Sequence, residues 1–309
     1  MKAVACTGYG PPDVLKLVDV PRPQPRKNEL CIRIVATAVT ASDCIVRTMQ
    51  PTSLTRVMAR LALGVTAPRQ PILGLVLAGE VDSVGPDVKT FKVRDSVFAF
   101  TGSRFGAYAE FACVPEDGFV AVQPANLTPE ETAALPYGGL LALYILRRSG
   151  AKNGQRVLIY GASGAIGTAA VQVARHLGAQ VTGVCSGANV ELVKSLGAAA
   201  VVDYTREDFT KSSKRFDVIL DAVGKRKSAN AMRDCPQVLA AAGVVISVDD
   251  GLARPVRSDM FQLKELAESG AIRPVIDRTY RLEEIVDAHR YVDQGHKRGN
   301  VVVTVGHET

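Results

Sequence analysis

Three glycines recur at three-residue intervals in the segment Val157–Gly167, between an apolar run and a stretch typical of a helix. Gly161 and Gly164 allow a tight turn and a close approach of the backbone to a diphosphate, and Gly167 lets the helix pack against the preceding strand. Free N–H groups at the start of that helix attract phosphate oxygens. A second strand and helix follow, which favours a dinucleotide-binding turn over a glycine-rich turn of another α/β fold. The expected cofactor contacts here are Gly161, Ala162, Ser163, Gly164, Ala165, Ile166 and Gly167.

The end of the next strand indicates which dinucleotide binds. An NAD site needs Asp or Glu there to hold the ribose 2′-hydroxyl, whereas this sequence reads Cys185-Ser-Gly-Ala-Asn189. Without a carboxylate a 2′-phosphate is not repelled, and Ser186 and Asn189 can donate hydrogen bonds to it. We therefore predict NADPH as the cofactor. The open alternative is a polar loop that tolerates both NADPH and NADH.

The composition of the chain limits the classes of protein to which it can belong. The chain has 309 residues, 47% hydrophobic and 22% charged, which predicts two domains and excludes a disordered chain. Its net charge of +6 suits a phosphorylated ligand, but no dense basic run points to nucleic acid. The longest charge-free stretch, Val157–Ala174, contains Gly, Ser, Thr and Gln, so we expect no stable membrane insertion.

The cysteines and the first residues of the chain indicate its compartment. The two closest cysteines, Cys31 and Cys44, are thirteen residues apart, so no Cys-x-x-Cys pair is present to hold zinc. No apolar run of the kind found in signal peptides follows Met1. We expect reduced thiols and a cytoplasmic location.

Short β segments separated by Gly, Pro and Asp make up the sequence as far as about residue 122. Closely spaced strands of this kind are typical of a barrel-like or sandwich domain. The predicted strands are Lys2–Thr7, Leu15–Val20, Glu29–Thr37, Leu77–Val84, Ser96–Phe100 and Ala107–Val114. A capping box at Thr128–Glu131 then opens a helix towards Arg148.

Strands and helices alternate after that helix, which predicts a parallel, doubly wound sheet. Its strands are Arg156–Tyr160, Gln180–Cys185, Ala200–Asp203, Asp217–Asp221 and Val244–Val248; its helices are Ala165–Leu177, Asn189–Leu196 and Asp259–Ser269. The residues between Val248 and Asp259 are too few for a helix and a sixth strand. We expect five strands in the order 3-2-1-4-5, with Val244–Val248 at or near an edge.

The end of the chain returns to the β pattern of its beginning. Arg273–Tyr280 and Asn300–Val305 are predicted strands, and Leu282–Gln294 is a predicted amphipathic helix. The fold class is therefore α/β, with the second domain inserted in the first. We assign residues 1–124 and 273–309 to the first domain and residues 125–272 to the dinucleotide-binding domain.

Several motifs spread over nearly the whole chain together resemble one family. They are Met1–Ala5 with Gly10–Pro12, Ala78–Val81 before Val84-Gly85, Gly106–Glu110, Gly161–Gly167, Val201–Tyr204, Asp217–Gly224 and Gly295–Val303. This pattern resembles the medium-chain dehydrogenase/reductases, in their zinc-lacking quinone oxidoreductase branch. The resemblance implies a GroES-like, β-barrel-type catalytic domain, a Rossmann domain, and hydride transfer from NADPH to a quinone or α,β-unsaturated carbonyl. It places Tyr204 near the adenosine phosphate. The remaining expected cofactor contacts are Val223, Gly224, Ser247, Val248 and Asn300.

Zinc alcohol dehydrogenases of the same superfamily are the main competitor. They hold zinc on a Cys three residues before an Asp and on a His-Glu pair in the following strand region. This chain has Thr40 before Asp43, and Leu75-Val76, none of which replaces a thiolate or an imidazole. We therefore predict no zinc. An enone or quinone is already electrophilic, so its reduction needs chiefly orientation.

Three residues are candidates for catalysis. Thr40 and Asp43 match the region that lines the nicotinamide pocket in relatives, although the quinone branch usually has Asn at position 40. Asp43 could instead cap a helix beginning near Cys44. Tyr137 could face the cofactor or pack within its helix. The amphipathic segment Pro51–Pro71 suits either a lid over the substrate cleft or a helix packed on the barrel.

The preferred function is an NADPH-dependent quinone or enone reductase with a small-molecule substrate. The alternatives are a catalytically weak dinucleotide-binding protein, crystallin-like or membrane-associated, and a zinc-independent alcohol dehydrogenase-like reductase. Relatives commonly dimerise through a sixth strand of the sheet. Its absence predicts a monomer, or a homodimer built through another surface.

Overall fold

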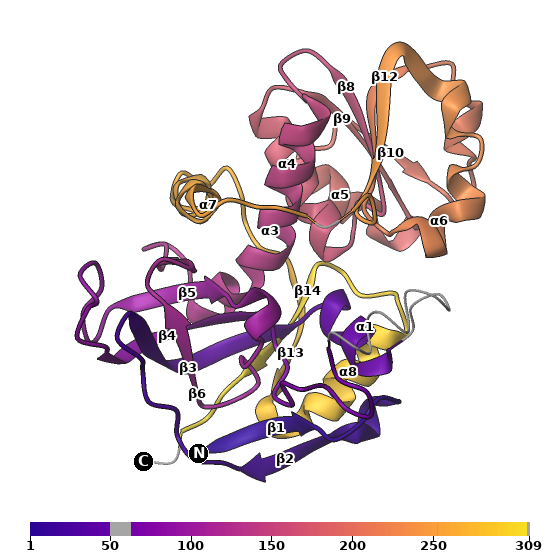
Figure 1. Ribbon diagram of the computed structural model, residues 1–309. Coiled ribbons are helices and arrows are strands. Elements are labelled where there is room, and N and C mark those ends of the chain that lie inside the picture. The colour runs from indigo at the N-terminus through magenta and orange to yellow at the C-terminus, as the bar shows by residue number, and fades with distance from the viewer. Residues whose placement is uncertain (50–62, 252, 308–309) are drawn as a thin grey trace. The chain divides into compact units, whose positions relative to one another are not determined.

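The chain forms two compact units in the computed structural model, which describes residues 1–49, 63–251 and 253–307 (Figure 1). Unit 1 comprises Met1–Pro136 and Ile276–Thr309, and unit 2 comprises Tyr137–Val275. The first boundary lies twelve residues beyond the one expected from sequence, because helix α3 (Pro129–Ser149) runs through it without a break. A capping box shows where a helix begins, and not to which domain its turns belong.

Unit 1 is built on a seven-stranded sheet in the order β13-β14-β3-β4-β5-β7, with β6 paired to β3. The strands are β3 (Glu29–Val39), β4 (Val76–Val84), β5 (Ser96–Phe100), β6 (Phe111–Pro115), β7 (Phe119–Val122), β13 (Ile276–Arg281) and β14 (Asn300–Thr304). A separate antiparallel pair consists of β1 (Lys2–Cys6) and β2 (Leu15–Asp19). Because side chains alternate along a strand, Leu30, Ile32 and Ile34 of β3 all enter one hydrophobic core.

The predicted strand Ala107–Val114 is wrong in its first half. Ala107 and Tyr108 donate their N–H groups to Gly74 and Leu73, outside any regular ladder, and the strand β6 begins only at Phe111. The apolar residues of this segment are buried, so their pattern resembles that of a strand. The carbonyl groups that accept its hydrogen bonds belong to Gly74 and Leu73, more than thirty residues earlier in the chain, so the local pattern did not reveal them.

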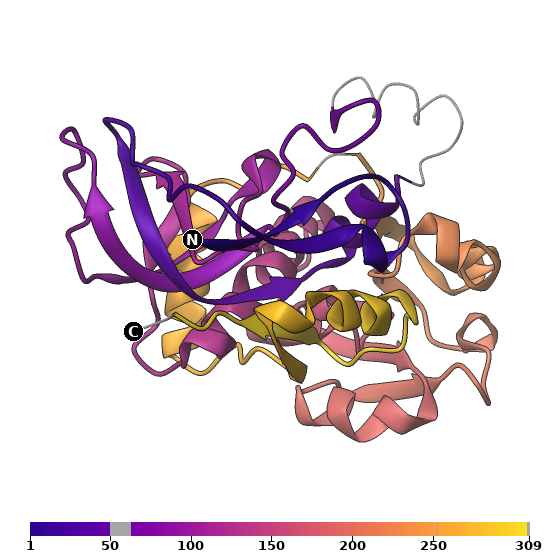
Figure 2. The same ribbon diagram turned by 90° about the horizontal axis from the view of Figure 1, so that it is seen from below.

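Besides the first turns of α3, unit 1 contains the helices α1 (Ala41–Thr48) and α8 (Ile285–Asp293). Figure 2 shows α8 alongside β14, with which it is in contact. Its buried residues are Ile285, Ala288, His289 and Val292, which share one face, as expected of the amphipathic helix predicted at Leu282–Gln294. The amphipathic helix expected within Pro51–Pro71 lies largely outside the described residues, which resume at Leu63.

Unit 2 contains five parallel strands in the order β10-β9-β8-β11-β12, which confirms the predicted 3-2-1-4-5 sheet. The strands are β8 (Arg156–Tyr160), β9 (Gln180–Cys185), β10 (Ala200–Asp203), β11 (Phe216–Asp221) and β12 (Leu239–Ser247). The edge strand β12 begins five residues before its predicted start. Its Val244 and Val245 are about 40% exposed, and residues 253–257 add no strand beyond it.

The helices of unit 2 follow from right-handed crossovers between parallel strands. The contacts of α4 (Ala165–His176) and α5 (Val190–Ser195) are with β8, β9 and β10. On the other side of β8 in the strand order, α6 (Lys225–Met232) packs on β11. It lies on the opposite face of the sheet from α4 (Figure 1). The sequence analysis missed α6, because its only buried residue is Ser228 and no apolar stripe marks it. The remaining helix, α7 (Ser258–Glu268), was expected at Asp259–Ser269.

Candidate cofactor and catalytic sites

The glycine-rich turn leads from β8 into α4, as the sequence predicts. Gly161 has φ +78°, and its N–H and that of Ala162 both donate to the Val184 carbonyl at 3.0 Å. A Cβ on Gly161 would lie 2.4 Å from the Val223 side chain, and one on Gly167 would lie 2.1 Å from the Gly161 carbonyl oxygen. Gly164 is the N-cap of α4 and no side chain caps that end. The first-turn N–H groups are therefore available to an anionic ligand.

A cluster of three polar side chains flanks this turn. The Asn189 amide nitrogen lies 3.3 Å from the Ser163 hydroxyl oxygen and 3.0 Å from that of Ser186. Asn189 is only 8% exposed, and its Oδ1 is buried without a hydrogen-bond partner among the described residues. An unpaired buried acceptor costs about 1–3 kcal/mol. In this orientation Oδ1 can accept a hydrogen bond from a ribose hydroxyl. If the amide is turned by 180° about χ2, Oδ1 accepts from both serine hydroxyls and the N–H groups can donate to a phosphate.

Tyr204 follows β10 and lies beside the same loop. Its N–H donates to the Cys185 carbonyl at 3.1 Å, and its side chain is half exposed. The preceding Asp203 accepts hydrogen bonds from the N–H and hydroxyl of Thr205, and these bonds lower the pKa of the Asp203 carboxyl. The exposed Arg206 lies 3.6 Å from the Asp203 carboxylate. The sequence analysis did not select Asp203 or Arg206.

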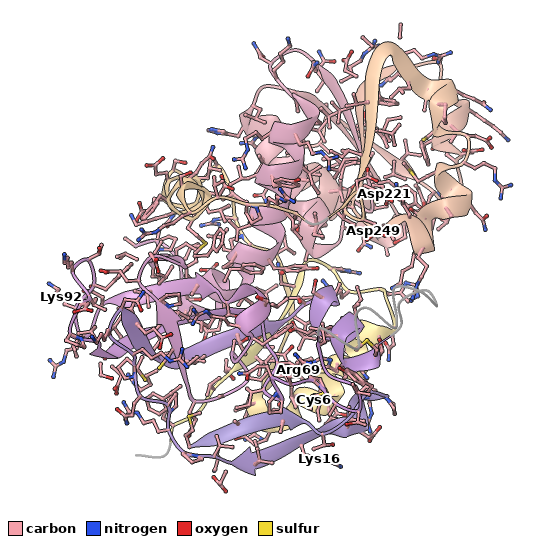
Figure 3. The ribbon with its side chains drawn as sticks, in the orientation of Figure 1. Cys6, Lys16, Arg69, Lys92, Asp221 and Asp249 are labelled. Carbon is pink, nitrogen blue, oxygen red and sulfur yellow. The ribbon has the colours of Figure 1, made fainter. Side chains whose placement is uncertain are left out.

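The buried carboxylate of Asp221 holds the loops after β11 and β12 together. It accepts from the N–H groups of Val223 and Gly224 at 3.0 and 3.1 Å, and from the hydroxyls of Ser228 and Ser247 at 2.6 and 2.9 Å. Figure 3 labels Asp221 and Asp249 at the end of the sheet where these strands stop. An acid directly after the apolar run Val218–Leu220 was a signal that the sequence analysis did not use.

The predicted contacts within unit 2 thus converge at the carboxyl ends of its strands, where open α/β sheets bind ligands. The glycine-rich turn, Ser186 and Asn189 are linked directly, and Val223 touches the turn at Gly161. Val248 donates its N–H to the Asp221 carbonyl at 3.0 Å. Together these residues form a cradle for a dinucleotide, and the orphaned Asn189 oxygen shows that the cradle has unused hydrogen-bonding capacity.

In unit 1, Thr40 and Asp43 form a capping box at the start of α1. Thr40 is the N-cap, so the helix begins at Ala41 and not near Cys44. The Thr40 hydroxyl donates to Asp43 Oδ2 at 2.7 Å, and the N–H groups of Thr40 and Gly74 donate to the same carboxylate. Asp43 is fully buried, and this desolvation raises its pKa to about 6.

A chain of buried polar groups continues from Asp43. The Tyr108 phenol hydrogen-bonds Asp43 and lies 3.2 Å from His289 Nε2, while His289 Nδ1 lies 3.5 Å from Cys44 Sγ. Burial lowers the pKa of His289 to about 3 and raises that of Cys44 to about 12. A consistent assignment has the Cys44 thiol donating to a neutral His289, His289 donating to Tyr108, and Tyr108 donating to Asp43. Sequence spacing gave no sign of this chain.

The other predicted residues lie in separate parts of the fold. Asn300 is the first residue of β14, one position before the Val301–Val39 pair, and therefore lies at the same end of this strand pair as Thr40. Tyr137 is buried in α3. The zinc-ligand positions carry the buried apolar residues Leu75 and Val76, and no group of three His, Cys, Asp or Glu suited to a metal occurs within 1–49, 63–251 and 253–307.

Both units match known families. Residues 26–124 match the alcohol dehydrogenase GroES-like domain, and residues 165–287 match a family described as zinc-binding dehydrogenase. Tomato (Solanum lycopersicum) 2-methylene-furan-3-one reductase is 33% identical over 319 aligned positions, which cover 98% of this chain and 79% of that protein. The chain belongs to the medium-chain dehydrogenase/reductase superfamily. It lies in the quinone oxidoreductase branch.

Further comparisons agree with this assignment. The chloroplastic NADPH-dependent alkenal/one oxidoreductase of Arabidopsis thaliana is 30% identical, again over 98% of this chain and 79% of that protein. The solved structure of a quinone oxidoreductase from Coxiella burnetii superposes with a TM-score of 0.84 at 28% identity, covering 99% of each chain. Unit 1 is thus the GroES-like domain and unit 2 the Rossmann domain of an oxidoreductase. No described helix is long and apolar enough to cross a membrane.

Proposed function

We propose that this oxidoreductase is zinc-independent and transfers hydride from NADPH to a quinone or an α,β-unsaturated carbonyl. The observation that carries the proposal is the side-chain set at the family's zinc position. Thr40 offers a single hydroxyl that is already bonded to Asp43, and Leu75 and Val76 are apolar and buried. These groups supply no thiolate or imidazole for zinc. A conjugated substrate needs no Lewis acid to become electrophilic.

The cradle of unit 2 supports NADPH as the cofactor, which when bound supplies the hydride. The first turn of α4 binds the diphosphate. The turned Asn189 amide donates to the 2′-phosphate while Ser186 donates to the Asn189 oxygen, and the exposed Tyr204 and Arg206 lie on the neighbouring strand end. The names of the tomato and Arabidopsis relatives agree with reduction of conjugated carbonyls.

The Thr40–Asp43 pair is the candidate source of a proton for the reduced substrate. While Asp43 is ionised, the Thr40 hydroxyl donates to it at 2.7 Å. Once Asp43 is protonated, its carboxyl can donate to the Thr40 oxygen, and the hydroxyl proton is then free for a substrate oxygen. Because the pKa of Asp43 is raised to about 6, this change of donor occurs within an ordinary range of pH.

The experiment that tests the proposal is steady-state NADPH oxidation in the presence of a chelator, with a panel of quinones and 2-alkenals. We expect turnover of these conjugated substrates and none of simple saturated ketones. Turnover of saturated ketones would favour the alcohol dehydrogenase-like alternative. Tight NADPH binding without turnover of any substrate would favour the catalytically weak alternative.

A further inference from the structure

Two free cysteines face each other on neighbouring strands of unit 1. Cys31 of β3 and Cys113 of β6 are direct partners in the antiparallel register. They are 82 positions apart in the sequence, so only the pairing of these strands brings them together. None of the residues assigned above to cofactor or substrate includes either cysteine.

The backbone hydrogen bonds show which type of pair this is. Ile34 N–H donates to the Glu110 carbonyl at 2.8 Å, and Glu116 N–H donates to the Asn28 carbonyl at 2.8 Å. Hydrogen-bonded and non-hydrogen-bonded pairs alternate along an antiparallel ladder, so Cys31 and Cys113 occupy a non-hydrogen-bonded position. There the Cα atoms lie about 4.5 Å apart. A disulfide needs Cα atoms roughly 4.4–6.8 Å apart, so the strands need not separate to form one.

The pair lies on the face of β3 that is turned away from the core. Leu30 and Ile32, on either side of Cys31, belong to the core cluster, and Cys31 and Cys113 do not. Cys31 is fully buried, with its Sγ 3.7 Å from the Pro23 carbonyl oxygen. Cys113 is half-buried. A small oxidant can therefore reach the Cys113 sulfur without disturbing the core.

The surroundings favour loss of the first proton from this pair. A hydrogen bond from Cys113 and the nearby Arg22 guanidinium lower the pKa of the Cys31 thiol, while the same hydrogen bond and burial raise the pKa of Cys113. Arg22 is held in place over the Phe111 ring at 4.0 Å and by an ion pair with Asp82. Cys31 is therefore the thiolate of the pair and the hydrogen-bond acceptor for the Cys113 thiol, so it can take the Cys113 proton and make that sulfur reactive towards oxidants.

We propose that Cys31 and Cys113 are a redox-modification site, at which a hydroperoxide forms a cross-strand disulfide that thiol reductants reverse. The Cys31 thiolate takes the Cys113 proton as the Cys113 sulfur attacks one peroxide oxygen, so that an S–O bond forms, the O–O bond breaks and the departing hydroxide is protonated to the first water. Cys31 then attacks the sulfenic sulfur of Cys113, so that the S–S bond forms, the S–O bond breaks and the second water leaves. Two thiols are oxidised and one peroxide is reduced to two waters.

The test uses the full-length protein treated with hydrogen peroxide, then denatured, alkylated and mapped by mass spectrometry. We expect a peptide linked through Cys31 and Cys113, the loss of two of the six titratable thiols, and their recovery with dithiothreitol. Cys113→Ser should abolish the linked peptide. Cys235→Ser, which removes a buried cysteine of unit 2, is the matched control and should retain it.

Two further readouts keep the proposal falsifiable. Arg22→Gln should shift the pH midpoint of the oxidation rate upward, because the thiolate loses a neighbouring positive charge. The proposal is overturned if both cysteines remain fully alkylatable after peroxide treatment. It is also overturned if Cys113 is converted to its sulfinic acid without any linked peptide, or if peroxide removes two of the five thiols that remain in Cys113→Ser.

Discussion

At the scale of single residues, burial decides what Asp43 contributes. Its carboxylate accepts hydrogen bonds from Thr40 and Gly74, and Tyr108 also hydrogen-bonds it, but the cost of desolvation outweighs these bonds and raises its pKa from 3.8 to about 6. The same burial keeps His289 neutral, so no cation in the chain Cys44–His289–Tyr108 balances the charge. Asp43 therefore links the start of α1 to the buried polar groups of unit 1, and the free-energy cost of burying its charge depends on pH.

The first prediction concerns this pH dependence. Between about pH 4 and 6 the folded protein holds a proton on Asp43 that the unfolded chain releases, so the free energy of unfolding falls as pH rises through this window. A shift of two pKa units corresponds to about 3 kcal/mol. In urea titrations at pH 4 and pH 7, the stability of the unchanged protein relative to Asp43→Asn should fall by up to this amount. The control is Asp117→Asn at an exposed position. An equal fall in the stability of the unchanged protein relative to Asp117→Asn would contradict the assignment to Asp43.

The second prediction tests cofactor discrimination at the end of β9. Ser186→Asp should weaken NADPH binding at least tenfold relative to NADH, because a carboxylate there repels a 2′-phosphate and suits a 2′-hydroxyl. Tyr204→Phe should weaken the binding of NADPH, and not that of NADH, by about 1.5–3 kcal/mol, the usual value of a hydrogen bond to a charged group. Dissociation constants at fixed ionic strength measure both effects, with the exposed Ser213→Asp as control. Equal affinity of the unchanged protein for NADPH and NADH would contradict the choice of NADPH.

At the scale of elements, the contact between β8 and α4 defines the cradle. Gly167 packs against the Gly161 carbonyl, where a Cβ would lie only 2.1 Å from the oxygen, whereas a Cβ on Gly164 would lie at an ordinary 3.6 Å from the same atom. Neither residue has a positive φ. The two glycines therefore serve different purposes: Gly167 permits the packing of α4, and Gly164 leaves room for the ligand.

The third prediction separates these roles. Gly167→Ala should lower the free energy of unfolding by about 1–3 kcal/mol, because α4 must shift to accept the methyl group. Gly164→Ala should leave stability within about 0.5 kcal/mol and weaken NADPH binding, because its methyl group occupies the approach of the diphosphate. Denaturant titration and cofactor titration on both variants provide the measurements. A Gly164→Ala variant with unchanged NADPH affinity would show that the diphosphate lies elsewhere.

At the scale of the whole molecule, the fourth prediction concerns metal dependence. Thr40, Leu75 and Val76 offer no thiolate or imidazole, so we expect substoichiometric zinc in the purified protein and full activity after prolonged exposure to a chelator. Elemental analysis and activity assays on the same sample provide the measurement. One zinc per chain, lost together with activity, would refute the zinc-independent mechanism.

The fifth prediction concerns assembly. Since the described residues between β12 and α7 add no further strand to the sheet of unit 2, the family's usual continuous sheet across two subunits lacks its pairing strand, and we expect a monomer or a dimer built through another surface. Val245→Lys, on the exposed part of β12, should leave the sedimentation coefficient unchanged, as should Val93→Lys in unit 1. A dimer that dissociates only with Val245→Lys would show that the β12 edge is the interface.

Sequence alone predicted most elements of the Rossmann domain, because their signals are local. The limits of β8, β9 and β10 matched the prediction, since each short segment contains two or more β-branched residues. The glycine-rich turn and the capping box at Thr128 depend on residues a few positions apart and were equally readable. The helix α6 was missed because it buries almost nothing and so carries no such pattern.

Tertiary structure decided the contacts between residues that are distant in the sequence. Asp43, Tyr108 and His289 come from three distant segments of the chain, and only the tertiary packing of unit 1 places their polar atoms within hydrogen-bonding distance. The pairing of Cys31 with Cys113 likewise depends on the register of two strands, and Asp221 reaches Ser247 only across adjacent strand ends. Local periodicity specifies which face of an element is buried, whereas the packing of whole elements determines which buried polar groups meet. The proposed chemistry of this protein depends on those contacts between buried polar groups.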